Sequence, residues 1–213
     1  GLYGIVLRGQ RSAAVTQFSS FLYSFGGGWF DEEGNSTVSE PEAIQAYEYY
    51  GNLLRNYGPP GTLNMSWPQA IAVFAQGQAA FYLDADILYT NVTNPETSLV
   101  VDQVGFAPFP EGPAGRRPYS VTSWAIGMNS ESENKEAAWE FIRWATSPQI
   151  VATMQSEFGQ SGARASVWAS PEGLGGFPED LANAIVVNGE TGVGFDRPRV
   201  IRVGEARDIV GQP

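Results

Sequence analysis

Trp124 stands in the segment Tyr119–Met128, beside the hydroxyl-bearing residues Ser120, Thr122 and Ser123. An indole is a flat apolar surface and hydroxyls donate and accept hydrogen bonds, a combination that suits the C–H faces and hydroxyl edges of a sugar ring. Large aromatic residues on strands usually bury, so the pattern fits a core position as well. The segment therefore predicts either a sugar-stacking platform or an ordinary core residue.

Asp84 and Asp86 directly follow the strand-like run Gln78–Leu83. Carboxylates two positions apart at the end of a strand point to the same side, roughly 6–7 Å from each other. That separation permits hydroxyl binding, and it also lies near the range of inverting glycosidases. Neighbouring carboxylates share one environment, whereas a catalytic acid and base stand on opposite sides of the scissile bond. The pair therefore favours binding over hydrolysis.

Two loops carry further candidates for ligand contact. Three consecutive glycines, 26–28, precede Trp29 and Phe30, and glycines allow the backbone to approach another group closely. A simple helix terminator explains the glycines, but it does not explain two large aromatics left in the same loop. Arg164 lies in the loop 160–178, and its fork of donors suits vicinal hydroxyls, although arginines in such loops are usually only solvated.

Composition excludes several kinds of chemistry. The 213 residues include no cysteine and no histidine, which removes thiol nucleophiles, imidazole bases, Ser–His–Asp triads and the usual zinc sites. The formal net charge of −11 opposes phosphate backbones, so we expect no nucleic-acid partner. We expect neither a metal nor a cofactor.

Hydrophobic periodicity predicts an α/β domain in which helices dominate. Four strand-like runs are expected to form a small mixed sheet, and the loop 160–178 is expected to be flexible. The strand-like runs are Leu2–Leu7, Gln78–Leu83, Val101–Pro108 and Tyr119–Met128. A helix is predicted from about Ser12 to Phe25, and another from Leu181.

Local signals predict where further helices begin and end. Capping boxes combine a hydroxyl residue with Glu or Gln three positions later, and Ser147-Pro148 is a typical helix start. The predicted boxes are Ser39 with Glu42, Ser66 with Gln69, and Ser130 with Glu133. The helix that begins after Ser147 is expected to end at Gly159.

Several motifs occur in the same order here and in a known family. They are GGGWF, SWPQAIAVFAQGQAAFYLDAD, VTSWAIGMNS, SENKEAAWEFIRWATSPQ and SGARASVW. The FxxGxAA pattern at Phe74–Ala80 and the run Ala137–Ser147 are the most specific. On these residues the chain resembles the carbohydrate-binding solute receptors of bacterial ABC importers, above all their sugar and polyol branch.

The resemblance implies a periplasmic-binding-protein-like fold of type II, with two α/β lobes that close on a ligand. We expect residues 1–213 to form a single domain that supplies one lobe, with the first lobe and the signal absent from this chain. The resemblance implies sugar stacking on Trp29 and Trp124, and ligand hydrogen bonds to Asp84 and Arg164. Phe30, Asp86 and Ser123 complete the predicted site.

The resemblance also implies partners and a location. It predicts a small carbohydrate or polyol as ligand, the membrane permease of an ABC transporter as partner, and a monomeric receptor. It places the full-length protein in the periplasm or outside the cell, tethered to the membrane. In this reading the protein is not an enzyme. The alternatives are a glycosidase-like enzyme using Asp84 and Asp86, and a protein-interaction domain with exposed aromatic residues.

Overall fold

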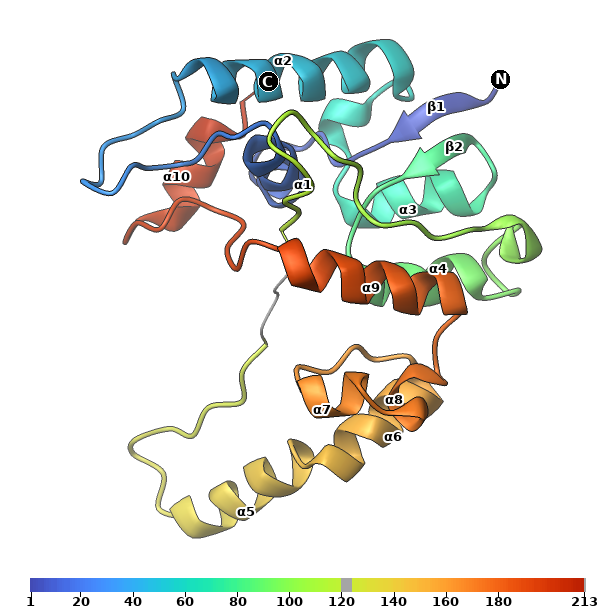
Figure 1. Ribbon diagram of the computed structural model, residues 1–213, viewed down its shortest axis with the longest axis vertical. Helices are drawn as coiled ribbons and strands as arrows, with labels where there is room; N and C mark the ends of the chain where they lie inside the picture. Colours follow the sequence, from blue (N-terminus) through green and yellow to red (C-terminus); the bar gives the residue numbers. More distant parts are fainter. Residues whose placement is uncertain (120–123, 213) are drawn as a thin grey trace.

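The computed structural model describes residues 1–119 and 124–212. Its chain forms an upper body and a lower arm made of α5 to α8, with α9 running between them (Figure 1). The strands and longer helices of the upper body are β1 (Tyr3–Val6), α1 (Arg11–Ser24), α2 (Pro41–Asn52), α3 (Trp67–Ala75), β2 (Ala79–Tyr82), α9 (Glu179–Thr191) and α10 (Val203–Val210). The helices of the arm are α5 (Lys135–Ala145), α6 (Pro148–Phe158), α7 (Ala165–Trp168) and α8 (Pro171–Leu174).

Short helices complete the upper body: the π-helix η1 (Leu53–Tyr57), the 3₁₀ helices η2 (Thr62–Asn64), η3 (Asp86–Leu88) and η4 (Val101–Gln103), and α4 (Tyr89–Thr93). The helix-rich α/β class predicted from periodicity is confirmed. None of the helices in the described ranges is long and apolar enough to cross a membrane.

The sheet of the described residues contains two parallel strands rather than the expected mixed set of four. Tyr3 pairs with Ala79 and Val6 pairs with Tyr82. Because parallel neighbours need a long crossover, the chain passes through α1, α2 and α3 between the two strands. Both strands therefore present their carboxyl ends at the same edge of the sheet.

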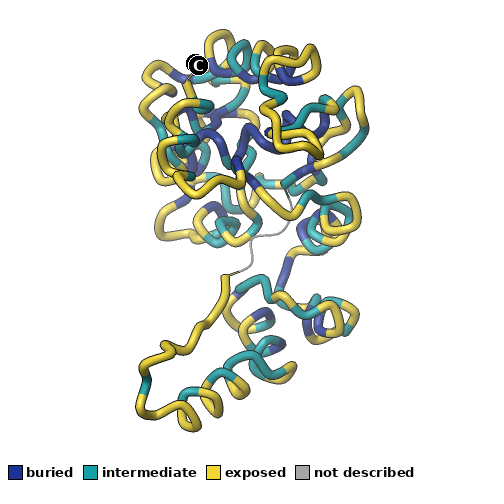
Figure 2. The backbone as a smooth tube through the Cα atoms, turned by 90° about the vertical axis from the view of Figure 1, so that its left-hand side faces the viewer, coloured by how far each residue is buried: buried dark blue, intermediate teal, exposed yellow. Residues whose placement is uncertain are grey.

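Helix α1 is the centre of the largest core cluster. Most of its residues from Ala14 onward are buried, and it packs against α2 and α10. The Phe18 ring stacks on Tyr47 with centroids 4.2 Å apart, which fixes α1 against α2. The buried residues of α1 lie on all sides of the helix and include polar ones, among them Gln17, Ser19, Ser20 and Ser24, so α1 is surrounded by other elements. In Figure 2 the buried segments concentrate in the upper body.

The glycine run after α1 ends this helix and permits a close approach. Gly26 adopts a φ of +94°, a left-handed conformation that glycine takes without steric cost. A Cβ at Gly27 would lie 2.7 Å from Leu22 Cδ1 and 3.2 Å from the Ala43 backbone nitrogen. These glycines therefore let the chain turn back against α1 and α2.

Two of the predicted helix starts are confirmed and two are wrong. Ser66 and Gln69 form a capping box on α3, and the Ser147 hydroxyl accepts from Ile150 N at the start of α6. Gly159 ends α6 with a φ of +62°. Helix α2 instead begins after Glu40, and α5 begins after Asn134; neither has a side-chain cap.

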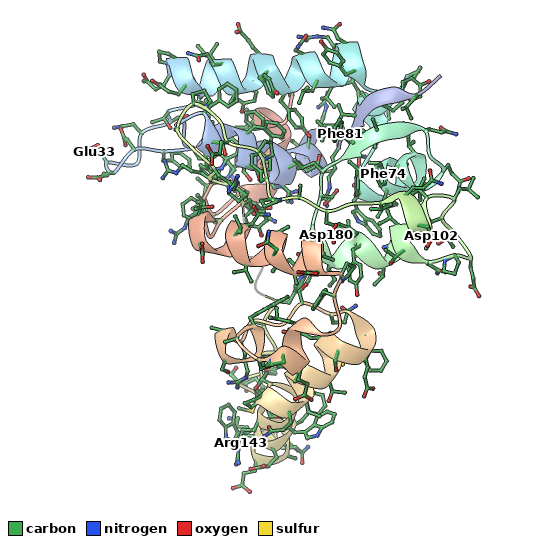
Figure 3. The ribbon with its side chains drawn as sticks, turned by 45° about the vertical axis from the view of Figure 1, so that its right-hand side comes forward. Glu33, Phe74, Phe81, Asp102, Arg143 and Asp180 are labelled. Carbon is green, nitrogen blue, oxygen red and sulfur yellow. The ribbon has the colours of Figure 1, made fainter. Side chains whose placement is uncertain are left out.

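Val101–Pro108 does not form the predicted strand. It begins as η4, and the extended residues that follow donate their backbone N–H groups to side chains of α9. Phe106 N lies 2.8 Å from Asp180 Oδ2, and Phe109 N lies 2.9 Å from Asn188 Oδ1. Figure 3 shows Asp180 near the end of α9 that faces the lower arm. Side chains of α9 thus take the place of a neighbouring strand.

The predicted strand Tyr119–Met128 falls partly on residues 120–123, which lie outside the described residues. Tyr119 forms an isolated parallel bridge with Val193, and Trp124–Met128 has no regular secondary structure. The predicted strand is therefore not seen in the described part of this segment.

The loop 160–178, expected to be loose, contains α7 and α8. Gln155 of α6 is fully buried beside it; its amide donates to Gly173 O at 2.9 Å and accepts from Gly162 N at 3.1 Å. The Trp168 indole donates to Gly162 O at 2.7 Å. These internal hydrogen bonds organise a segment whose composition suggested flexibility.

Candidate ligand-binding site

Arg8 and Asp84 meet at the carboxyl edge of the sheet. Each stands two residues beyond a strand, Arg8 after β1 and Asp84 after β2. Arg8 Nε donates to Asp84 Oδ2 at 2.8 Å, and Arg8 Nη2 forms an ion pair with Asp84 Oδ1. In open α/β sheets, ligands bind outside the carboxyl ends of the strands. A ligand-binding site is therefore expected at this edge of the sheet.

Buried polar groups hold the Asp84 carboxylate in place. Gln17 Nε2 donates to Asp84 Oδ2 at 3.0 Å, and the Tyr82 hydroxyl donates to the same oxygen at 2.9 Å. Burial and the charge of Asp84 raise the pKa of Tyr82 far above its usual value, so this phenol stays a donor. With two oxygens shared among so many donors, Asp84 has little capacity left for a ligand.

The backbone of Arg8 is fixed from both sides. Its N–H donates to Gln17 Oε1 at 2.7 Å, and its carbonyl accepts from the Tyr50 hydroxyl at 2.6 Å. Burial opposes the charge of the guanidinium, but the hydrogen bond and charge of Asp84 outweigh it and raise the pKa of Arg8. Arg8 is therefore a permanent and positioned cation.

One edge of the Arg8 guanidinium remains unused. Nη1 makes no hydrogen bond to any residue that the structure describes, and 13% of the side chain is exposed, against 2% for Asp84. Arg8, rather than Asp84, thus retains donors for a hydroxyl ligand. The sequence signal for Arg8 is its position directly after the predicted strand Leu2–Leu7.

Asp86 and Arg164 both form hydrogen bonds within the protein. Asp86 does so where the upper body meets the arm, and Arg164 does so inside the arm. Asp86 accepts a hydrogen bond from the Ser161 hydroxyl, which connects η3 to the chain after α6. Arg164 precedes α7 and donates from Nε to Thr146 O. Asp84 and Asp86, predicted to act on the same side, therefore have different partners.

Trp29 lies in the core, contrary to the expectation that it lines an exposed surface. It is 3% exposed, and its ring meets Phe18 edge to face with centroids 6.0 Å apart. The glycines before it allow the loop to fold back onto α1. Sugar stacking on Trp29 stays a prediction, and it would require this ring to leave the core.

Phe30 is partly exposed and forms an isolated bridge with Ser36 at the base of a polar turn. Glu33 marks the tip of this turn, on the opposite side of the molecule from Asp102 (Figure 3). The remaining predicted residue, Ser123, lies outside the described residues.

Trp124 lines an open hollow of about 800 Å³ beside α10. The indole is 91% exposed, so Trp124 is not a core residue, and sugar stacking on it stays a prediction. Arg197 and Arg199 share this hollow, and the Arg199 guanidinium lies 5.5 Å from the Phe195 ring centroid. Cations and aromatic faces here surround a space that is open to solvent.

Asp196, one of the residues that line this hollow, is buried and paired. It bonds with Arg197 and accepts from Thr16 Oγ1 at 2.7 Å. Burial raises the pKa of Asp196, but the bonds from Arg197 and Thr16 outweigh it and lower the pKa overall. Thr16 is the neighbour of Gln17, which binds Asp84, so α1 connects the hollow to the sheet edge.

The structure therefore places the predicted residues in three groups. Asp84 lies at the sheet edge with Arg8, Trp124 lies in the hollow, and Asp86 contacts the arm that holds Arg164. Trp29 joins none of them. Within the described ranges, no group of three or more His, Cys, Asp or Glu side chains could hold a metal ion.

Comparison with known proteins shows which family this chain resembles. Residues 3–152, more than half of the chain, match the family of bacterial extracellular solute-binding proteins. The mannitol-binding protein of Pseudomonas aeruginosa is 34% identical over 149 residues, which cover 69% of this chain and 34% of that protein. The chain thus spans about a third of the length of this curated relative.

Solved structures match almost the whole chain. A solute-binding protein from Agrobacterium radiobacter K84 in complex with ribitol is 30% identical with a TM-score of 0.79; the match covers 99% of this chain and 53% of that one. Maltose-bound MalE3 of T. maritima is 28% identical with a TM-score of 0.82, covering 99% and 54%. The chain belongs to the bacterial extracellular solute-binding proteins.

Proposed function

We propose that this chain is part of the extracytoplasmic substrate-binding component of an ABC importer, and that its ligand is a sugar or a polyol. The match to the ribitol complex over 99% of the chain carries this proposal. The mannitol-binding relative supports the same ligand class. The chain would supply one lobe of a two-lobe receptor, because the matched structures are nearly twice as long.

The sheet edge supplies a donor of the required kind. A ligand with several hydroxyls needs fixed donors and acceptors, and selectivity follows from their placement. Asp84 holds the Arg8 guanidinium side-on, which leaves Nη1 directed away from the carboxylate. Arg8 would therefore bind ligand oxygen, and Asp84 would position it.

The hydrogen-bond partners of Asp84 and Asp86 support a ligand-binding protein over a glycosidase. A glycosidase needs one carboxyl group as proton donor and a second as base or nucleophile. Asp84 is tied to Arg8, Gln17 and Tyr82, whereas Asp86 is bonded to Ser161. The two carboxylates are used as structural acceptors at different contacts, which supports a receptor and not an enzyme.

The proposed receptor acts outside the cytoplasm, in the periplasm or at the cell surface, where the full-length protein is tethered to the membrane. Its partner is the membrane permease of the transporter, which recognises the ligand-closed form. It functions as a monomer. The family, described as extracellular solute-binding, supports this location. A relative named as a probable amino-acid ABC transporter periplasmic-binding protein supports a transporter as the partner.

Titration of the 213-residue chain with ribitol, mannitol and maltose tests the proposal. One open face leaves much of the ligand in water, so little of the gain from burial survives the entropy of immobilisation. We expect dissociation constants of about 1 mM or weaker, near −4 kcal/mol. Amide shifts in NMR spectra should change around Arg8.

Two results would contradict the proposal. Binding in the micromolar range would show a self-contained site that needs no second lobe. Absence of any shift around Arg8 at ligand concentrations of about 100 mM, where a millimolar site is saturated, would exclude this sheet edge as the site. Incubation with glycosides, followed by assay of reducing ends, separates the receptor from the enzyme.

A further inference from the structure

The chain that leads into α10 is rich in arginine, although the protein as a whole is acidic. Residues 197–207 contain four of the 12 basic residues and one of the 23 acidic residues. Figure 1 shows this part of the chain next to α1 in the upper body, and residues 197–201 line the hollow that also contains Trp124. Because charges farther apart than about 10 Å are largely screened at about 0.1 M salt, the local arginines set the potential in this hollow.

Arg199 is a cation that no carboxylate of the described residues compensates. It forms no ion pair with any residue that the structure describes. Its guanidinium lies over the Phe195 ring, 5.5 Å from the centroid, and an aromatic face attracts a cation without occupying its N–H groups. The five N–H donors of Arg199 therefore remain available to a ligand in the hollow.

Among the described residues that line the hollow, Asp196 is the one acid, and Arg197 neutralises it. Arg197 donates to both oxygens of this carboxylate, from Nε and from Nη2. Thr16 Oγ1 also donates to Asp196 Oδ2, at 2.7 Å. The charges of Arg197 and Asp196 therefore cancel, and the hollow keeps the positive charge of Arg199.

A further cation, Arg207 of α10, lies close to Asp196. Its Nη2 is 3.5 Å from Thr16 Oγ1 and also donates to Ser12 O, while its Nε is buried and bonds to no described residue. Burial and, after it, the charge of Arg197 lower the pKa of Arg207, so two guanidinium groups repel each other here. A bound anion would stabilise these neighbouring cations.

Aromatic side chains form the apolar part of the hollow. The rings of Trp124 and Phe195 are both exposed there, and flat apolar faces suit the C–H groups of a hydroxylated carbon chain or ring. The volume of about 800 Å³ is that of a site for a small molecule. An arginine fork binds a carboxylate through two parallel hydrogen bonds. The hollow therefore combines surfaces for a carbon skeleton with a donor for one negative charge.

We propose that the ligand of this receptor is a sugar acid, a sugar or polyol with one terminal carboxylate, and that Arg199 binds this carboxylate in the hollow. The inference rests on the proposed function and narrows its ligand class from sugars and polyols to their acids. Because Arg197 is already bound to Asp196, a single negative charge matches the hollow better than the near-double charge of a phosphate.

The hydroxyls of such a ligand are bound at the sheet edge. Thr16 bonds Asp196, and the next residue, Gln17, bonds Asp84, so the hollow and the sheet edge adjoin through α1. Arg8 then donates to a hydroxyl, while Arg199 donates to the carboxylate. The charge of the ligand is the property that the hollow selects.

Ribitol and D-ribonate are a matched ligand pair, because ribonate has a carboxylate in place of one terminal hydroxymethyl group. In NMR titrations we expect the chain to bind ribonate at least about fivefold tighter than ribitol, with amide shifts at 195–203 for ribonate. Raising NaCl from about 20 mM to about 500 mM should weaken ribonate at least about threefold and leave ribitol nearly unchanged, because salt screens the charge. Acetate, which lacks the hydroxyls, should bind at least about tenfold more weakly than ribonate.

Arg199→Gln should reduce the preference for ribonate over ribitol to about twofold or less. Arg202→Gln is the matched control, because it removes the same charge from an exposed arginine that pairs with Glu205 and is not among the residues that line the hollow. It should keep the preference. The inference is overturned, and the proposed function stands, if ribitol binds as tightly as ribonate, if both variants reduce the preference equally, or if ribitol 5-phosphate binds tighter than ribonate. Binding of none of these ligands contradicts the proposed function as well.

Discussion

Asp84 Oδ2 lies 2.8 Å from Arg8 Nε, and the same oxygen lies 3.0 Å from Gln17 Nε2. One carboxylate therefore joins the chain just beyond β1, the chain just beyond β2 and the first half of α1. Because the pair is shielded from water, loss of either partner leaves a charge or a set of donors without compensation.

Asp84→Asn should destabilise the protein by about 3 kcal/mol, because it leaves the Arg8 charge largely buried and unpaired. Urea unfolding at neutral pH measures the change. Glu140→Gln is the control, since the Glu140–Arg143 pair is exposed and should contribute less than about 1 kcal/mol. Equal effects of the two variants would show that the Arg8–Asp84 pair is not a structural link.

Arg8→Lys keeps the charge but removes the fork that binds Asp84 side-on and leaves Nη1 for a ligand. We expect polyol binding to fall at least about fivefold, by about 1 kcal/mol, measured by NMR titration with ribitol. Arg143→Lys, at the far end of the arm, should not change binding. Wild-type affinity in Arg8→Lys would mean that Arg8 only supports the fold.

Gly159→Ala should destabilise the protein for two reasons. The residue has a φ of +62°, and an added Cβ would lie 2.0 Å from the Tyr89 hydroxyl oxygen. Gly34→Ala isolates the first reason: its φ is +85° with open space around it, so it should cost about 1 kcal/mol. Tyr89→Phe should restore part of the stability of Gly159→Ala in a double-mutant cycle. No coupling would indicate that the ring moves aside freely.

Asp196 should make stability depend on pH in the acid range. Its folded pKa is below 3.8, so its contribution is present above pH 3.8 and is lost as pH falls through the folded pKa. The advantage of wild type over Asp196→Asn should therefore be constant near neutral pH and shrink as pH falls below about 4 in urea titrations. Thr16→Val, which removes one hydrogen bond to the carboxylate, should show a smaller pH effect than wild type. An advantage that is constant with pH would contradict the assignment.

Tyr47 should make the stability of the protein depend on pH in the alkaline range. Burial raises the pKa of its phenol to about 12, and its hydroxyl donates to Val210 O at 3.0 Å. Because the folded pKa is above the unfolded value of 10.0, this contribution is complete below pH 10 and is lost as pH rises toward 12. Tyr47→Phe should be about 1 kcal/mol less stable near pH 8, with a smaller further loss near pH 11. Parallel losses in both proteins would show that Tyr47 ionises freely.

The sequence alone determined the features that depend on neighbours along the chain. The capping box at Ser66, the cap at Ser147 and the left-handed stop at Gly159 are each set within a few residues, and the structure contains all three. The ordered motifs also identified the family. Helix periodicity is likewise local, since residues three and four positions apart already share a face.

Tertiary structure decided which side chains remain available for a ligand. Trp29 and Trp124 look alike in sequence, but α1 covers one indole and nothing described covers the other. The carboxylate of Asp84 is occupied because β1 places Arg8 next to it from 76 positions away. A strand likewise exists only where a partner backbone lies beside it, so the alternation of Trp124, Ile126 and Met128 cannot produce one by itself.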